Sequence, residues 1–166
     1  MRRSIALLLF VLACSVAPAF AGIVFEAHLT GAQSVPPNSS LASADGVFTL
    51  NDAGTQLSWV ITFQGLEAPL ISAHLHRVPT GTGVPLTIGL NPPLGLTSGS
   101  WSGVANVSPT TVAEMQAGMF YANIHSEAYV DGEIRGTLVV STTTGARRGT
   151  WGRIKALYRS QGPGGR

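Results

Sequence analysis

The sequence predicts an all-β fold, an antiparallel Greek-key sandwich or small barrel with one short helix near 109–117. Short stretches in which apolar and polar residues alternate recur from residue 22 to residue 141, and this period of two is typical of half-buried strands. Segments rich in glycine, proline and asparagine separate these stretches at regular intervals, as turns do. Many short strands with frequent turns favour a sandwich or a barrel.

Residues 1–21 are predicted to be a secretory signal peptide. Arg2 and Arg3 precede an apolar run over 5–12, and small residues occupy the two positions that a signal peptidase reads before Gly22. The run is too short to span a bilayer, because a transmembrane helix needs about 20 apolar residues. We therefore expect a secreted or periplasmic protein with one domain over 22–141.

A second interpretation of the N-terminus concerns Cys14, the only cysteine of the chain. Residues 11–14 resemble a lipobox, so a lipoprotein anchored at Cys14 is the alternative to cleavage near Gly22. A chain cleaved near Gly22 contains no thiol and no disulfide, and its stability must come from packing.

The expected strands follow one another along the domain, and a long connection rich in glycine and proline surrounds the short strand near 86–88. By residue number they are 23–30, 46–50, 56–63, 71–78, 86–88, 99–104 as an edge strand, 119–125, and 136–141 as the closing strand. Ahead of the closing strand, 133–135 alternates in the same way after a turn at Asp131-Gly132.

The helix is predicted from its boundaries. Ser108 is a favourable N-cap, Pro109 suits the first helical position, and Gly118 stands just past the end.

Charge divides the chain into an acidic domain and a basic tail. Residues 22–141 hold eight acids and two bases, a formal charge of −6, whereas 142–166 hold six bases and no acid. The high isoelectric point is therefore not a nucleic-acid signal for the domain. For the tail, a disordered segment and a short helix on an anionic surface both remain open.

Three of the four histidines share a pattern that suits metal binding. His74 and His76 are two residues apart, so they project from one face of a strand, and His125 lies on the polar face of a second strand together with Tyr121 and Asn123. If the two strands meet, three imidazoles converge, and such a site with an open position holds zinc or copper. The alternative is that these histidines lie on a solvent-exposed polar face of the sheet and bind no metal. His28 is a weaker fourth candidate.

Other residues could support these ligands. Glu127, Asp131 or Glu133 could orient a ligating imidazole by accepting a hydrogen bond from its other ring N–H. Glu133 and Arg135 are expected on one face, where they would form an ion pair or act in this supporting role. No Gly-x-Ser-x-Gly elbow, phosphate loop or dinucleotide fingerprint occurs in the sequence, so no catalytic residue is assigned.

The chain also resembles a known family, the chordin-type (CHRD) domain. The matching motifs lie in order from about residue 23 to residue 140, at 25–37, 65–76, 99–103, 118–125 and 132–136. The resemblance implies an extracytoplasmic all-β domain, and it places His74, His76 and His125 among the family's hallmark positions. The sequence departs from the pattern at Val84-Pro85, where a Gly-Pro pair is typical.

Two functions follow from these observations. The first is a secreted or envelope-associated binding module that is not an enzyme, with copper or zinc on the three histidines and an unidentified protein or envelope component as partner. The second is a copper-dependent redox enzyme on the same histidines.

Overall fold

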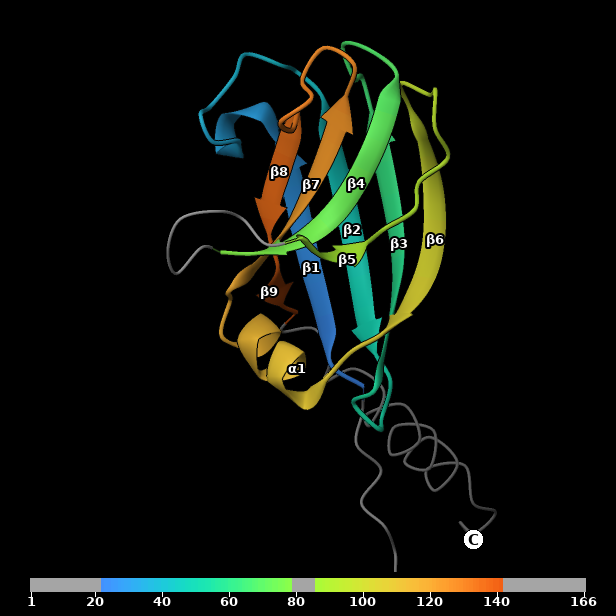
Figure 1. Ribbon diagram of the computed structural model, residues 1–166, viewed down its shortest axis with the longest axis vertical. Helices are drawn as coiled ribbons and strands as arrows, with labels where there is room; N and C mark the ends of the chain where they lie inside the picture. The colour runs from blue at the N-terminus through green and yellow to red at the C-terminus, as the bar shows by residue number, and fades with distance from the viewer. Residues whose placement is uncertain (1–21, 79–85, 142–166) are drawn as a thin grey trace, which may run out of the picture.

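The protein is described by a computed structural model over residues 22–78 and 86–141, which form an antiparallel sheet curled into a nearly closed barrel (Figure 1). The strands are β1 (Val24–Thr30), β2 (Ser43–Leu50), β3 (Gln56–Gln64), β4 (Leu70–Arg77), β5 (Leu86–Gly89), β6 (Gly99–Asn106), β7 (Phe120–Ser126), β8 (Ile134–Thr137) and β9 (Val139–Val140). They are hydrogen-bonded in the order β5-β4-β7-β8-β1-β2-β3-β6, with β9 paired to β1. The all-β prediction is confirmed, and β6 is an edge strand as expected.

The expected signal peptide, Cys14 and the basic tail lie outside the described residues, as does the loop that contains Val84-Pro85. No helix within the described ranges combines the length and the apolar character needed to cross a membrane.

Alternation of apolar and polar residues builds the barrel core. In β3, Leu57, Trp59, Ile61 and Phe63 point inward and are buried, while the residues between them are exposed. β1 and β2 repeat this pattern, and their buried side chains pack against those of β3 in one cluster. The polar side chains are therefore presented on the outside of the barrel.

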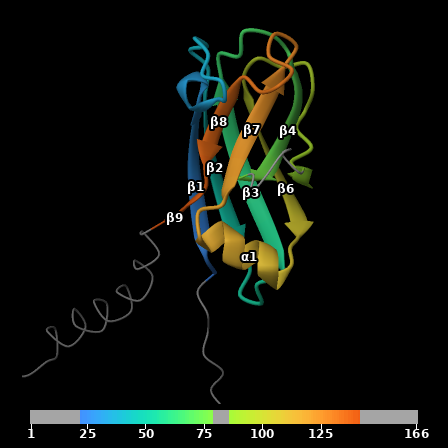
Figure 2. The same ribbon diagram turned by 60° about the vertical axis from the view of Figure 1, so that its left-hand side comes forward.

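A 3-10 turn, η1 (Gly31–Gln33), follows β1, and the helix α1 (Pro109–Gln116) lies at one end of the barrel (Figures 1 and 2). The Thr111 backbone N–H donates to the Ser108 hydroxyl at 3.1 Å, so the predicted N-cap is confirmed. Met115 is fully buried in the core, which attaches α1 to the barrel. An ion pair of 3.1 Å between Arg77 of β4 and Glu114 adds a second attachment.

The C-terminal part of the domain differs from the expectation of one strand over 136–141. β8 and β9 are separate: β8 pairs with β7 and with Thr30 of β1, whereas β9 pairs with Phe25 and Glu26 at the start of β1. Leu138 between them is fully buried in the core. The connection from β7 to β8 is also longer than a two-residue turn. It contains two successive turns, closed by the N–H of Tyr129 bonding to Ser126 O and the N–H of Gly132 bonding to Tyr129 O.

Candidate metal centre

The pairing of β4 with β7 decides where the histidines lie. His74 faces Asn123 across the two strands, His76 faces Tyr121, and His125 faces Ser72. All three histidines are on the outer, partly buried face, because the residues between them in β4 and β7 fill the core. His125 is therefore the diagonal neighbour of His74 across the strand pair.

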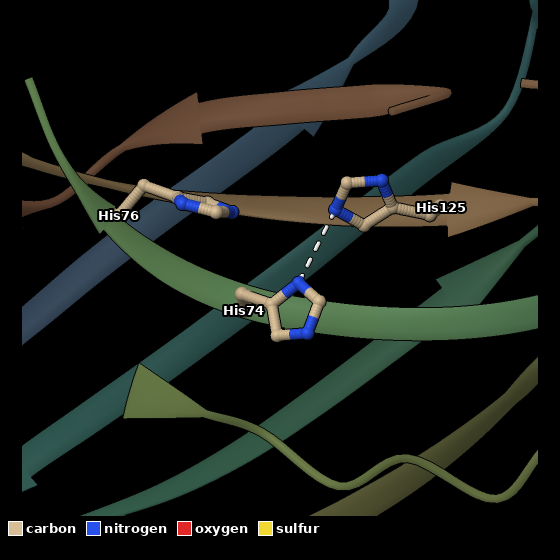
Figure 3. Close-up of side chains that lie close together, drawn as sticks. All are labelled: His74, His76 and His125. Carbon is tan, nitrogen blue, oxygen red and sulfur yellow. Dashed lines mark hydrogen bonds between the residues drawn. The ribbon is translucent and has the colours of Figure 1, made fainter. Parts of the chain in front are cut away.

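The three imidazoles converge, as the sequence predicts if the strands meet. Each histidine offers one ring nitrogen such that the three nitrogens all lie within 4.8 Å of one another. His74 Nδ1 and His125 Nε2 are 3.3 Å apart (Figure 3). The ring centroids of His74 and His76 are 5.4 Å apart, and those of His74 and His125 are 5.2 Å apart.

The tautomer of His125 follows from its second hydrogen bond. Its Nδ1 lies 2.9 Å from Val130 O, and a carbonyl oxygen only accepts, so Nδ1 carries the proton and donates it. The lone pair of Nε2 then faces the other two histidines. Histidines that bind metals commonly have this arrangement, with the second ring N–H held by a carbonyl.

Burial keeps two of these histidines in the neutral form that a metal requires. Desolvation lowers the pKa of His74 from its ordinary value of 6.5, and the charge of His125 lowers it further. Desolvation also lowers the pKa of His125, although the bond to Val130 O and the carboxylate of Asp131 act in the opposite direction. Neutral imidazole is the ligand form, so both rings are available to a metal near neutral pH.

A column of stacked side chains adjoins the histidines. The ring of Tyr121 stacks on His76 with centroids 5.3 Å apart, and the guanidinium carbon of Arg135 lies 3.5 Å from the Tyr121 centroid. A pocket of about 350 Å³ opens beside the column and is lined by His76, His125, Tyr121 and Arg135, among others.

Glu133 and Arg135 have different partners, so the expected ion pair between them is not found among the described residues. The carboxylate of Glu133 is fully buried, where Oε1 accepts from the Ser40 hydroxyl at 2.6 Å and from the Glu67 backbone N–H at 2.9 Å. Glu133 directly precedes β8, and its side chain points toward the loops that contain Ser40 and Glu67. Arg135 lies on the outer face. Of the two, only Arg135 lines the pocket.

His28 is separate from the cluster. It lies on β1 opposite Asp45 of β2, and its Nδ1 is 2.7 Å from Asp45 Oδ1 on the exposed surface. The group of ligand atoms that could share an ion contains His74, His76 and His125 and does not include His28.

Some residues of the pocket were not proposed from the sequence. Tyr121 and Asn123 alternate with the core residues of β7 and share the face of His125, so the signal for them was present. Ser34 and Gly132 come from loops, and nothing in the local pattern indicates that these loops reach the same pocket.

Comparison with known proteins identifies the family. A model of the CHRD domain family matches residues 25–138, which is more than half of the chain and includes all three histidines. Neither a curated protein nor a solved structure matched the sequence. The chain belongs to the CHRD domain family.

Proposed function

We propose that this CHRD domain is an exported binding module that holds one copper or zinc ion on His74, His76 and His125. The observation that carries the proposal is the convergence of three imidazole nitrogens within 4.8 Å of one another. The predicted signal peptide and membership of the CHRD family support an extracytoplasmic location.

The spacing of the nitrogens suits a small transition-metal ion. Two nitrogens bound to one tetrahedral zinc at about 2.0–2.1 Å lie about 3.3 Å apart. His74 Nδ1 and His125 Nε2 already have a separation of 3.3 Å, so these two rings need little movement to share an ion. The ring nitrogen of His76 lies within 4.8 Å of the other two nitrogens, and a rotation of its side chain is enough to bring it to the same ion.

The chemistry of the ligands selects the class of metal. Three neutral imidazoles suit zinc and copper, whereas calcium and magnesium prefer carboxylate and carbonyl oxygens. Three protein ligands also leave at least one coordination position open, and the pocket beside His76 and His125 gives a further ligand access to it.

An open position next to a pocket favours a second function, a copper-dependent redox enzyme on the same histidines. The two functions differ in what the bound ion does. Copper that returns to its starting state after reduction by ascorbate and exposure to oxygen would favour the enzyme. Bound zinc, or copper that does not cycle, would favour the binding module.

The decisive experiment measures metal content in the full chain produced without a histidine tag. We expect about one zinc or copper per chain after dialysis in the original protein and in His28→Ala, which removes an exposed histidine that is not part of the cluster. We expect His125→Ala to lose the metal while its circular dichroism spectrum and its melting without metal stay close to those of the original protein.

The outcome that overturns the proposal is equally definite. It is wrong if the original protein holds no stoichiometric metal when exposed to either ion. It is also wrong if His125→Ala and His28→Ala retain equal amounts.

A further inference from the structure

The pocket beside the histidines contains a cation, Arg135, that forms no ion pair among the described residues. Arg135 lines the pocket, and the ion pairs within the described residues join His28 to Asp45 and Arg77 to Glu114 instead. One face of the Arg135 guanidinium rests on the Tyr121 ring at 3.5 Å. Stacking of this kind orients the guanidinium and leaves the N–H groups at its edge able to bind a carboxylate with two parallel bonds.

The same pocket contains a buried acceptor. Asn123 is 8% exposed, and its Nδ2 donates to Asp131 O at 3.3 Å. Its Oδ1 is buried and has no hydrogen-bond partner among the residues that the structure describes. A buried acceptor without a hydrogen bond costs free energy, so a ligand that donates a hydrogen bond to Oδ1 would be bound favourably.

A glycine of the pocket lining packs directly against the Asn123 amide. Gly132 has a φ of +122°, and a Cβ built there would come within 2.4 Å of both amide atoms of Asn123. Any side chain at position 132 would therefore displace the amide.

The charges of the pocket limit the ligand. Arg135 lines it as a cation, and Asp131 lines it as an acid. A ligand with one negative charge can pair with Arg135, whereas a phosphate with two charges would meet stronger repulsion from Asp131. The volume of about 350 Å³ is at the small end of the usual range for ligand sites, which suits a metabolite rather than a peptide.

We infer that this pocket binds a small hydroxycarboxylate. Its carboxylate pairs with Arg135, and its hydroxyl donates to Asn123 Oδ1. The inference goes beyond metal binding, and it rests on the proposed function only where the bound ligand also reaches the ion on His76 and His125.

The test begins with metal-free protein and three related probes. Lactate carries both groups, propionate lacks the hydroxyl, and lactamide lacks the charge. Binding is followed by nuclear magnetic resonance of the histidine and tyrosine ring protons. We expect saturable shifts at Tyr121 and His125 for lactate, with an affinity at least about tenfold higher than for propionate or lactamide.

Variants connect the binding to named residues. Arg135→Gln should weaken lactate binding by at least about tenfold, whereas the charge-matched control Arg77→Gln, which lies outside the pocket, should change it by less than about twofold. Asn123→Ala should remove the preference for lactate over propionate. The ring-proton spectrum and the melting temperature show whether each variant is folded, and Arg135→Lys is the second variant if Arg135→Gln is not.

The outcomes separate this inference from the metal proposal. Lactate binding that depends on Arg135 in a protein without affinity for zinc or copper would support the pocket ligand and overturn the metal site. A protein that binds metal but binds lactate no better than propionate and lactamide, or equally well after Arg135→Gln, would overturn the pocket ligand alone.

Discussion

His28 and His74 begin from the same local pattern but lie in different surroundings. Each is on the polar face of an alternating strand. His28 has Asp45 across the strand pair and is largely exposed, whereas His74 has His125 as its diagonal neighbour and is partly buried. The difference teaches that the partner strand, and not the histidine's own strand, makes a histidine a candidate ligand.

The largest expected effect tests this contrast directly. With free zinc at about 1,000 times the dissociation constant, binding should stabilise the original protein and His28→Ala by about 4.1 kcal/mol. In His74→Ala the zinc affinity should fall more than about 100-fold, because removing a ligand costs more than removing its supporting partner. Thermal melts with and without zinc measure both effects. Equal zinc stabilisation of the two variants would break the contrast.

The next effect concerns the loop wall of the pocket, a feature that the His28 surface lacks. Gly132→Ala should destabilise the domain by about 3 kcal/mol, since it adds both a strained φ and a clash with Asn123. Gly54→Ala is the matched control, because Gly54 also has a positive φ of 69° but has nothing within 4 Å of its Cβ position. It should cost only about 1 kcal/mol. Urea unfolding measures both, and equal losses would mean that Asn123 tolerates the side chain.

A smaller effect is the pH dependence of the metal-free domain. The folded-state pKa values of His74 and His125 lie below the ordinary 6.5, so the unfolded chain binds more protons than the folded one in this range. The stability from these neutral rings is therefore complete above about pH 6.5 and is lost as the pH falls through the folded-state values. Urea unfolding from pH 7.5 to pH 5 should show the decline. His125→Gln should reduce its slope, and an unchanged slope would assign the decline to other groups.

The smallest effect is expected at the His28 pair. Asp45→Ala should cost less than about 1 kcal/mol, because both side chains are exposed and water screens their interaction. The same urea experiment measures it. A loss as large as that expected for Gly132→Ala would show that the exposed pair is more than a surface contact.

Prediction from the sequence worked where a signal is local. The alternation in β3 and the cap at Ser108 each depend on a few neighbouring residues, and the structure confirms both. The convergence of His125 with His74 was only conditional, because the pairing of β4 with β7 joins segments about 50 residues apart. The structure shows that β4 and β7 do pair, but nothing in the sequence of either strand specifies this pairing.

The partners of Glu133 show where local reasoning fails. Its spacing from Arg135 predicts a shared face, yet Glu133 precedes β8 and its carboxylate binds Ser40 and the Glu67 N–H. Both partners come from loops whose path depends on the whole barrel. A buried carboxylate held by such distant segments has no signature in the neighbouring sequence.

The alternation of β4 has a consequence for misfolded forms of the domain. A slip of β4 by one residue against β7 would turn His74 and His76 into the core and bring Ala73 and Leu75 to the surface. Such a form would bury two polar rings and expose core residues, so its free energy would be much higher than that of the native fold. The residues proposed to bind metal therefore also disfavour incorrect pairing of β4 with β7. A chain in which β4 is misaligned would lose both stability and the histidine cluster.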